Sequence, residues 1–252
     1  MTARHRLVVW GLIGSLVLAA VLGGVAWTVR SEYIDTKLAQ ARAERGPIAR
    51  SFDEGWPDRS GPRVLLIGDS RVAHWKPYLP TDLPVMERGL PGETAVQLAR
   101  RFSRDGLGAG ADIIVVQAGI NDLVAASLMP ADARAAVVDA VSRAFAAMHA
   151  AAEGAGICLV PTTIVPPSHP SLARWLVWDS SVFGMVEHVN ARLRAAGGPS
   201  GTAVLDAAAL LAPEGRVESP FRRDTLHLTA PAYDALNAAL RQHVMDLAAA
   251  CR

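Results

Sequence analysis

Short apolar runs, separated by longer segments with a helical pattern, constrain the fold of this 252-residue chain more than any other feature. Apolar runs of about five residues without polar alternation are typical of strands buried on both faces of a parallel sheet. Glycine or proline follows several of the runs, as expected where a strand ends in a turn. The predicted strands are 63–67, 84–88 (the weakest of them), 112–116, 156–160 and 202–206.

Two other segments repeat apolar residues at the spacing of one helix face. The second of them begins after Thr229, a suitable N-cap, and has Pro231 in its first turn. Strands that alternate with helices predict a three-layer α/β sandwich with right-handed crossovers. The repeating residues are Val137, Val141, Phe145 and Met148 in segment 130–153, and Tyr233, Leu236, Leu240, Val244 and Leu247 in segment 230–250.

Composition excludes several classes of protein. Hydrophobic residues make up 51% of the chain and the formal net charge is +1, which argues against disorder and against a nucleic-acid-binding protein. No phosphate-binding loop and no dinucleotide-binding fingerprint occurs in the sequence. Cys158 and Cys251 form no C-x-x-C pair and lack zinc-ligand spacing, so we expect two thiols rather than a disulfide.

The N-terminal segment predicts a single membrane-spanning helix. Leu7 to Val29 is uncharged and mostly apolar, and about 20 such residues span the hydrocarbon core of a bilayer. Arg4 and Arg6 precede the run, which keeps the N-terminus cytoplasmic and sends the folded domain across the membrane. A signal peptide cleaved before Trp27 is the first alternative, because small residues precede that position. A buried core helix is the second alternative.

The chain divides into three parts. Residues 1–30 form the membrane anchor or signal peptide, and residues 31–62 form a juxtamembrane helix, to about Arg45, followed by a linker. Repeated glycine and proline residues interrupt the helical pattern in that linker. We expect the folded domain to cover residues 63–252.

Chemically useful side chains follow the predicted strands. Ligands of parallel α/β sheets bind outside the carboxyl ends of the strands. Ser70 follows the first strand, Gly92 the weak second strand and Asn121 the third, whereas Asp224 and His227 precede the last helix. All of these positions can meet at one edge of the sheet.

Each of these residue types suits acyl transfer. A serine hydroxyl needs a neighbouring base, and histidine, with an unperturbed pKa of about 6.5, fits that role. A carboxylate three residues before the histidine can orient its ring. We therefore predict Ser70 as nucleophile, His227 as general base and Asp224 as the orienting acid. The amides of Ser70 and Gly92 and the side-chain amide of Asn121 are the predicted oxyanion donors.

These residues and their order resemble the SGNH (GDSL-like) hydrolases over roughly the last three quarters of the chain. The four blocks of that family match Ser70, Gly92, Asn121 and His227, and its triad acid matches Asp224. The last block looks closest to the platelet-activating-factor acetylhydrolase and carbohydrate acetylesterase branch. The resemblance implies a flavodoxin-like α/β/α fold with a central parallel sheet, ester hydrolysis, no metal and no cofactor.

Two positions depart from the usual pattern of that family. Arg71 follows the nucleophile where many relatives have a small or apolar residue, and Glu93 stands where aspartate is commoner. Neither change removes a catalytic atom, but both leave the substrate open. Asp69 is predicted to stabilise the loop after the first strand, and His74 and Trp75 to pack or line a pocket.

The predicted function is hydrolysis of an acyl ester, which we expect to be an acetyl ester on a cell-envelope or exported glycan. The alternatives are a lipid-directed esterase, such as a lysophospholipase or thioesterase, and an O-acetyltransferase with the same triad. The aromatic segment 166–185 is either a packed loop or one wall of the substrate site. The expected partners are this ester substrate and the membrane, and the oligomeric state stays open.

Overall fold

The computed structural model describes residues 3–41, 52, 54–175, 177–197 and 204–248. Its centre is a parallel sheet of four strands in the order β2-β1-β3-β4. The strands are β1 (Val64–Gly68), β2 (Val85–Gly89), β3 (Ile113–Gln117) and β4 (Cys158–Pro161). Their positions confirm four of the predicted strands, including the weak one.

The strand predicted at 202–206 is reduced to one contact in the described part of the chain. Leu205 forms a parallel bridge with Thr162, which extends β4 by one position at the edge of the sheet. Residues 202–203 lie outside the described residues. The order of the strands, with Leu205 beside the end of β4, matches the flavodoxin-like arrangement.

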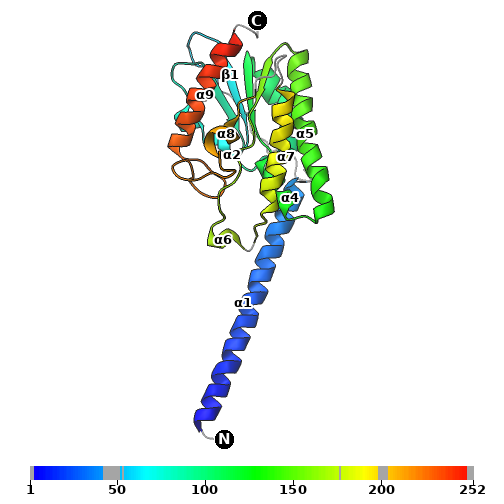
Figure 1. Cartoon of the computed structure of the whole chain (residues 1–252), viewed down its shortest axis with the longest axis vertical. Coiled ribbons are helices and arrows are strands. Elements are labelled where there is room, and N and C mark those ends of the chain that lie inside the picture. The colour runs from blue at the N-terminus through cyan, green and yellow to red at the C-terminus, as the bar shows by residue number, and fades with distance from the viewer. Residues whose placement is uncertain (1–2, 42–51, 53, 176, 198–203, 249–252) are drawn as a thin grey trace.

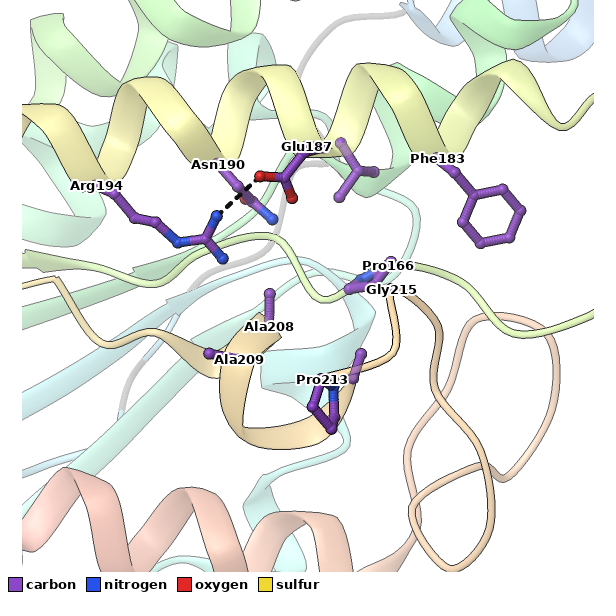
Figure 2. A pocket seen from close by; sticks show the side chains of 11 residues that line it. Pro166, Phe183, Glu187, Asn190, Arg194, Ala208, Ala209, Pro213 and Gly215 are labelled. Atoms are coloured by element: carbon purple, nitrogen blue, oxygen red, sulfur yellow. Dashed lines mark hydrogen bonds and ion pairs between the residues drawn. The ribbon is translucent and has the colours of Figure 1, made fainter.

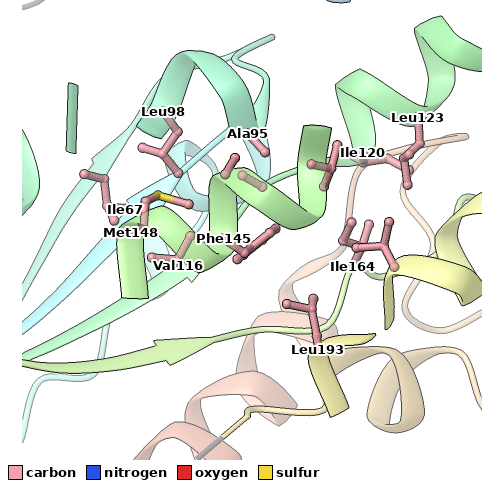
Figure 3. Packing of buried hydrophobic residues seen from close by; sticks show 14 of the residues in the cluster. Ile67, Ala95, Leu98, Val116, Ile120, Leu123, Phe145, Met148, Ile164 and Leu193 are labelled. Atoms are coloured by element: carbon pink, nitrogen blue, oxygen red, sulfur yellow. The ribbon is translucent and has the colours of Figure 1, made fainter. Parts of the chain in front are cut away.

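Helices cover both faces of the sheet (Figure 1). Alternate side chains of β1 enter different cores, because successive residues of a strand point to opposite faces. Leu65 and Ile67 join one hydrophobic cluster, whereas Val64 and Leu66 join the other. Figure 3 shows the first cluster, in which strand side chains meet helices packed on the same face. These layers confirm the predicted three-layer α/β/α fold.

The first cluster lies under α3 (Ala95–Arg101), α4 (Ile120–Ser127), α5 (Ala131–Gly154) and α7 (Ser181–Ala196). The second lies under α2 (Ser70–Ala73), α8 (Ala207–Leu211) and α9 (Ala230–Ala248). The helices α5 and α9 confirm the two segments predicted from apolar spacing. Short helical segments complete the domain: η1 (Lys76–Tyr78), η2 (Phe102–Gly106), η3 (Leu107–Ala109) and α6 (Leu172–Trp175).

One continuous helix, α1 (Ala3–Ala41), precedes the domain. Its segment Val8–Ala39 is long and apolar enough to cross a membrane, and the apolar 18-residue stretch within it has a mean hydropathy of 2.3 and no buried residue. The C-terminal part of α1 packs against α4, and Leu38 reaches the first hydrophobic cluster. The predicted juxtamembrane helix therefore continues the apolar helix without a break as far as Ala41, and residues 42–45 lie outside the described residues.

The cysteine prediction needs correction. Cys158 in β4 is disulfide-bonded rather than a free thiol. Cys251, the only other cysteine of the chain, lies outside the described residues. Spacing along the sequence did not reveal this bond, because a disulfide depends on the spatial distance between two residues rather than on their separation in the chain.

Candidate active site

Three of the predicted site residues form a continuous chain of hydrogen bonds. Ser70 is the first residue of α2, directly after β1, whereas Asp224 and His227 lie in the loop before α9. His227 Nε2 is 3.2 Å from Ser70 Oγ, and His227 Nδ1 is 2.8 Å from Asp224 Oδ2. Residues that are 157 positions apart in sequence thus meet within hydrogen-bonding distance.

Asp224 also organises its own loop. Its Oδ1 accepts hydrogen bonds from the backbone N–H groups of Leu226 and His227, at 2.8 and 3.0 Å. Burial by itself would raise the pKa of Asp224, but these two amides and the His227 ring outweigh it and lower the pKa to about 2. Asp224 is therefore an ionised acceptor beside His227 throughout the neutral range.

Asp69 has the structural role predicted for it. Its Oδ1 accepts a hydrogen bond from the N–H of Arg71 at 2.9 Å and caps the first turn of α2, which begins with Ser70. The N–H of Asp69 donates to the carbonyl of Gln117 in β3 at 3.1 Å. Burial raises the pKa of Asp69 to about 6, against the opposing effect of Arg71. These contacts hold the turn that presents Ser70.

Arg71 joins the Ser70 turn to the His227 loop. Its side chain is buried, and its Nε donates to the carbonyl of Leu226 at 2.9 Å while its Nη1 donates to the carbonyl of Val165. The hydroxyl of Tyr233 in α9 donates to the Arg71 carbonyl at 2.9 Å. A small residue at this position could not make the side-chain contacts. Arg71, which departs from the usual family pattern, therefore links the turn that contains Ser70 to the loop that contains His227.

His74 and Trp75 have different surroundings. Trp75 is fully buried and donates from Nε1 to Asn237 Oδ1 at 2.7 Å, so it packs as predicted. The ring of His74 meets the ring of His227 edge-on, with centroids 4.8 Å apart. Burial and the neighbouring His227 lower the pKa of His74. His74 is therefore a direct neighbour of the predicted base, a contact that no sequence motif indicated.

Asn121 and the loop that contains Gly92 meet through one hydrogen bond. Asn121 lies in the first turn of α4 after β3, and its Nδ2 donates to the carbonyl of Glu93 at 2.9 Å. Gly92 has φ +81°, a conformation that favours glycine. Asp122 Oδ2 accepts from the N–H of Ala95 at 2.8 Å, and burial raises its pKa to about 7. Asp122 therefore ties α4 to the start of α3.

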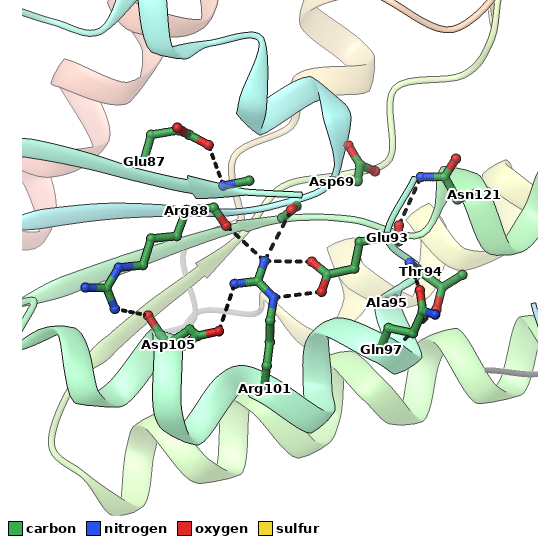
Figure 4. Close-up of polar contacts among 12 residues, drawn as sticks. Asp69, Glu87, Arg88, Glu93, Thr94, Ala95, Gln97, Arg101, Asp105 and Asn121 are labelled. Atoms are coloured by element: carbon green, nitrogen blue, oxygen red, sulfur yellow. Dashed lines mark hydrogen bonds and ion pairs between the residues drawn. The ribbon is translucent and has the colours of Figure 1, made fainter. Parts of the chain in front are cut away.

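Glu93 is one end of a buried polar network (Figure 4). Arg101 donates from Nε and Nη2 to the two carboxylate oxygens of Glu93 at 2.7 and 2.6 Å. Arg101 Nη2 also donates to the carbonyl of Arg88 at 2.9 Å, at the end of β2. The side chain of Glu93 reaches Arg101 in this bidentate geometry. Glu93, which stands where aspartate is commoner in the family, therefore has a structural role.

The buried pair should be essential for stability. We expect Arg101→Leu to lower the free energy of unfolding by about 3–5 kcal/mol, because Glu93 would stay buried without its partner. Arg104→Ala is the matched control, since Arg104 is 64% exposed where it pairs with Asp105, and we expect it to cost less than about 1 kcal/mol. Chemical denaturation of the detergent-solubilised full chain measures both. Equal losses would contradict the assignment.

The aromatic segment 166–185 contributes to a cavity of about 560 Å³ between α7 and α8 (Figure 2). Pro166 and Phe183 line it, and none of the predicted catalytic or oxyanion residues does. The ring of Trp178 meets the ring of Phe183 edge-on at 6.5 Å. The prediction that this segment forms a wall of the substrate site stays a prediction. In the described part of the chain, no cluster of three or more His, Cys, Asp or Glu is placed to hold a metal.

Comparisons with known proteins show the family and agree with the fold. A family model of GDSL-like lipases and acylhydrolases matches residues 51–235. No match was found among curated proteins. Solved structures show the same fold. One, from Bacteroides fragilis and classed as an acylhydrolase, is 20% identical with a TM-score of 0.63, and the match covers 83% of this chain and 95% of that one.

Two further structures extend the comparison. A GDSL-like lipase from Bacteroides thetaiotaomicron is 21% identical with a TM-score of 0.61, and the match covers 86% of this chain and 97% of that one. A catalytic mutant of an acetylxylan esterase from Geobacillus stearothermophilus is 13% identical with a TM-score of 0.57, over 74% and 95% of the two chains. Because the family model spans well over half of the sequence, the chain belongs to the GDSL-like lipase/acylhydrolase family and is a carboxylic ester hydrolase.

Proposed function

We propose that the protein is an extracytoplasmic serine esterase that removes an acetyl group from a cell-envelope or exported glycan. The observation that carries the proposal is the hydrogen-bonded series from Ser70 Oγ through His227 to Asp224. A serine in this position has a base within reach, and the base has an ionised partner on its other nitrogen. No part of the reaction needs a cofactor.

In the proposed mechanism, Ser70 Oγ attacks the carbonyl carbon of the ester while His227 Nε2 takes the hydroxyl proton. The tetrahedral intermediate collapses, and His227 gives this proton to the leaving alkoxide, which departs as the alcohol. Water then attacks the acyl-enzyme and loses a proton to His227. Ser70 Oγ leaves with that proton, and the carboxylic acid is released. Asp224 holds the ring and stabilises the imidazolium in both halves.

The oxyanion of each tetrahedral intermediate is assigned to the amides of Ser70 and Gly92 and the side chain of Asn121. The Ser70 N–H is at the start of α2, where a helix N–H has no partner within the helix. One hydrogen of the Asn121 amide is donated to Glu93, which fixes the orientation of the group. A primary amide has two N–H hydrogens, so the second one can be donated to the oxyanion.

Three observations support the substrate and the location. The acetylxylan esterase among the solved structures acts on an acetylated glycan, as its name states, and has the same fold. The exposed apolar helix α1 fits a membrane anchor or a signal sequence, and either takes the domain out of the cytoplasm. The disulfide at Cys158 supports an oxidising compartment. The proposed partners are thus the glycan ester and, through α1, the membrane.

The nucleophile can be tested directly. A fluorophosphonate probe should label the full chain and should not label Ser70→Ala, because the probe reacts with an activated serine. The unlabelled wild-type protein should release acetate from acetylated glycans and prefer short p-nitrophenyl esters over long ones. Labelling that survives in Ser70→Ala would refute the nucleophile, whereas preference for long acyl chains would favour a lipid-directed esterase.

Asn121→Ala should lower kcat by about 10²–10³, or roughly 2.7–4 kcal/mol of transition-state stabilisation, with KM little changed. The reason is that an oxyanion contact strengthens only as charge develops. Steady-state kinetics on p-nitrophenyl acetate measures the effect, and a thermal melt of the same variant separates chemistry from folding. A change mainly in KM would assign Asn121 to ground-state binding, and loss of the fold would make it a structural residue.

A further inference from the structure

The candidate active site and α1 are connected at one end of the domain. Ser70 and Asn121 follow the carboxyl ends of β1 and β3, and α4, which contains Asn121, packs against the C-terminal part of α1. Figure 1 shows α1 leaving the domain at the end where α4 and α6 lie, whereas the C-terminal end of α9 is at the opposite end. The carboxyl edge of the sheet therefore faces the direction in which α1 extends.

The helical turn α6 projects from the same end. It belongs to the long loop after β4, so it starts from the carboxyl edge of the sheet. Leu172 is 95% exposed and Trp175 is 70% exposed. Outside α1, they are the two most exposed large hydrophobic side chains of the described residues. Two such side chains on one turn indicate a surface that contacts another apolar phase.

The position of α6 along the axis of α1 follows from an electrostatic interaction between one residue of each helix. Arg174 of α6 lies close enough to Lys37 of α1 for electrostatic repulsion. Lys37 is eight residues beyond Val29, the last residue of the uncharged run, which corresponds to about 12 Å along the helix. The headgroup layer is about 5–8 Å thick on each side of a bilayer. Side chains that extend from α6 toward the membrane can therefore reach that layer, more so when the helix tilts.

We propose that α6 is a second membrane contact, through which Leu172 and Trp175 insert into the interfacial layer of the bilayer that α1 spans. The tryptophan ring is amphipathic and favours this layer, and leucine adds apolar area. The guanidinium of Arg174 can reach the lipid phosphates while its stem stays against the apolar side chains. The inference rests on the proposed anchoring of the chain by α1.

This contact has a consequence for the substrate. Attachment by α1 and α6 holds the domain at two points and directs the carboxyl edge, with Ser70, toward the membrane surface. The site is then placed for esters carried at that surface, in particular acylated glycans still linked to a membrane component, rather than for esters free in bulk solvent.

Depth-dependent fluorescence quenching in vesicles tests the contact. Single cysteines replace Leu172 or Trp175 in the full chain, are labelled with an environment-sensitive nitrobenzoxadiazole dye without reductant, and are reconstituted into phosphatidylcholine–phosphatidylglycerol vesicles. Doxyl groups on shallow positions of the acyl chains should quench both labels about twofold or more, because interfacial side chains lie about 5–10 Å into the headgroup boundary. Met245→Cys is the matched control, since Met245 is 63% exposed near the end of α9, and it should stay unquenched.

A label at Leu18→Cys, at the middle of the apolar part of α1, is read with doxyl groups near the ends of the acyl chains and separates the possible outcomes. Quenching at positions 18, 172 and 175 but not at 245 supports the proposal. Quenching at position 18 alone overturns the α6 contact and leaves the anchor intact, whereas no quenching at any position overturns both. Fluorophosphonate labelling of Ser70 in the same vesicles reports the esterase independently, so failure of the membrane contact is distinguishable from failure of the proposed function.

Discussion

His227→Ala is expected to lower kcat on p-nitrophenyl acetate by about 10⁴–10⁶-fold, the largest effect of any substitution outside Ser70 itself. The imidazole is 3.2 Å from Ser70 Oγ, and its removal leaves the hydroxyl without the base that takes its proton. KM should change little, because the ring acts on the reacting atoms rather than on the bound ester. Steady-state kinetics measures both constants.

The double variant provides the sharper test of this prediction. The kcat of the double variant Ser70→Ala/His227→Ala should be nearly the same as that of either single variant, because the two side chains act as one unit. His188→Ala is the matched control, since His188 lies on the exposed face of α7 and should retain full activity. Additive losses in the double variant would mean that Ser70 and His227 act independently.

Asp224→Asn should have the second-largest effect, about 10⁴-fold in kcat. The carboxylate accepts from His227 Nδ1 at 2.8 Å and so selects the ring tautomer that leaves Nε2 free to accept the Ser70 proton. An amide at this position can donate to Nδ1 and favour the wrong tautomer. Asp234→Asn, an exposed substitution on α9, is the control and should be silent. Full activity of Asp224→Asn would remove Asp224 from the triad.

The pKa of Asp224 gives this variant a second readout. Because the folded-state pKa is lowered to about 2, the stabilising interactions of the carboxylate are present above the ordinary carboxyl pKa of about 4 and are lost as the pH falls through about 2. The wild-type chain should therefore lose more stability than Asp224→Asn between about pH 4 and pH 2. Thermal melting of both proteins across this range measures the difference.

Local patterns predicted much of the fold. Buried strands and amphipathic helices differ in the period of their apolar residues, and this period is visible in any short window of sequence. The pattern at 84–88 was weak but formed β2, because β1 beside it supplies the parallel partner. The run at 202–206 had a similar composition, yet only Leu205 of its described residues pairs with the sheet. Strand pairing depends on a neighbour, which the run itself does not contain.

The side chains of Ser70, Asn121 and His227, in the order of a known family, are enough to predict the chemistry of the site, because a residue type carries its reactive group in any surroundings. The contacts that support these residues appear only in the folded chain. Arg71 binds the carbonyl of Leu226, 155 residues away, and this contact exists only after the chain has folded. The packing of α1 on α4 is of the same kind. Neither residue of such a contact stands out in the sequence, because its role depends on the distant residue that it contacts in the folded protein.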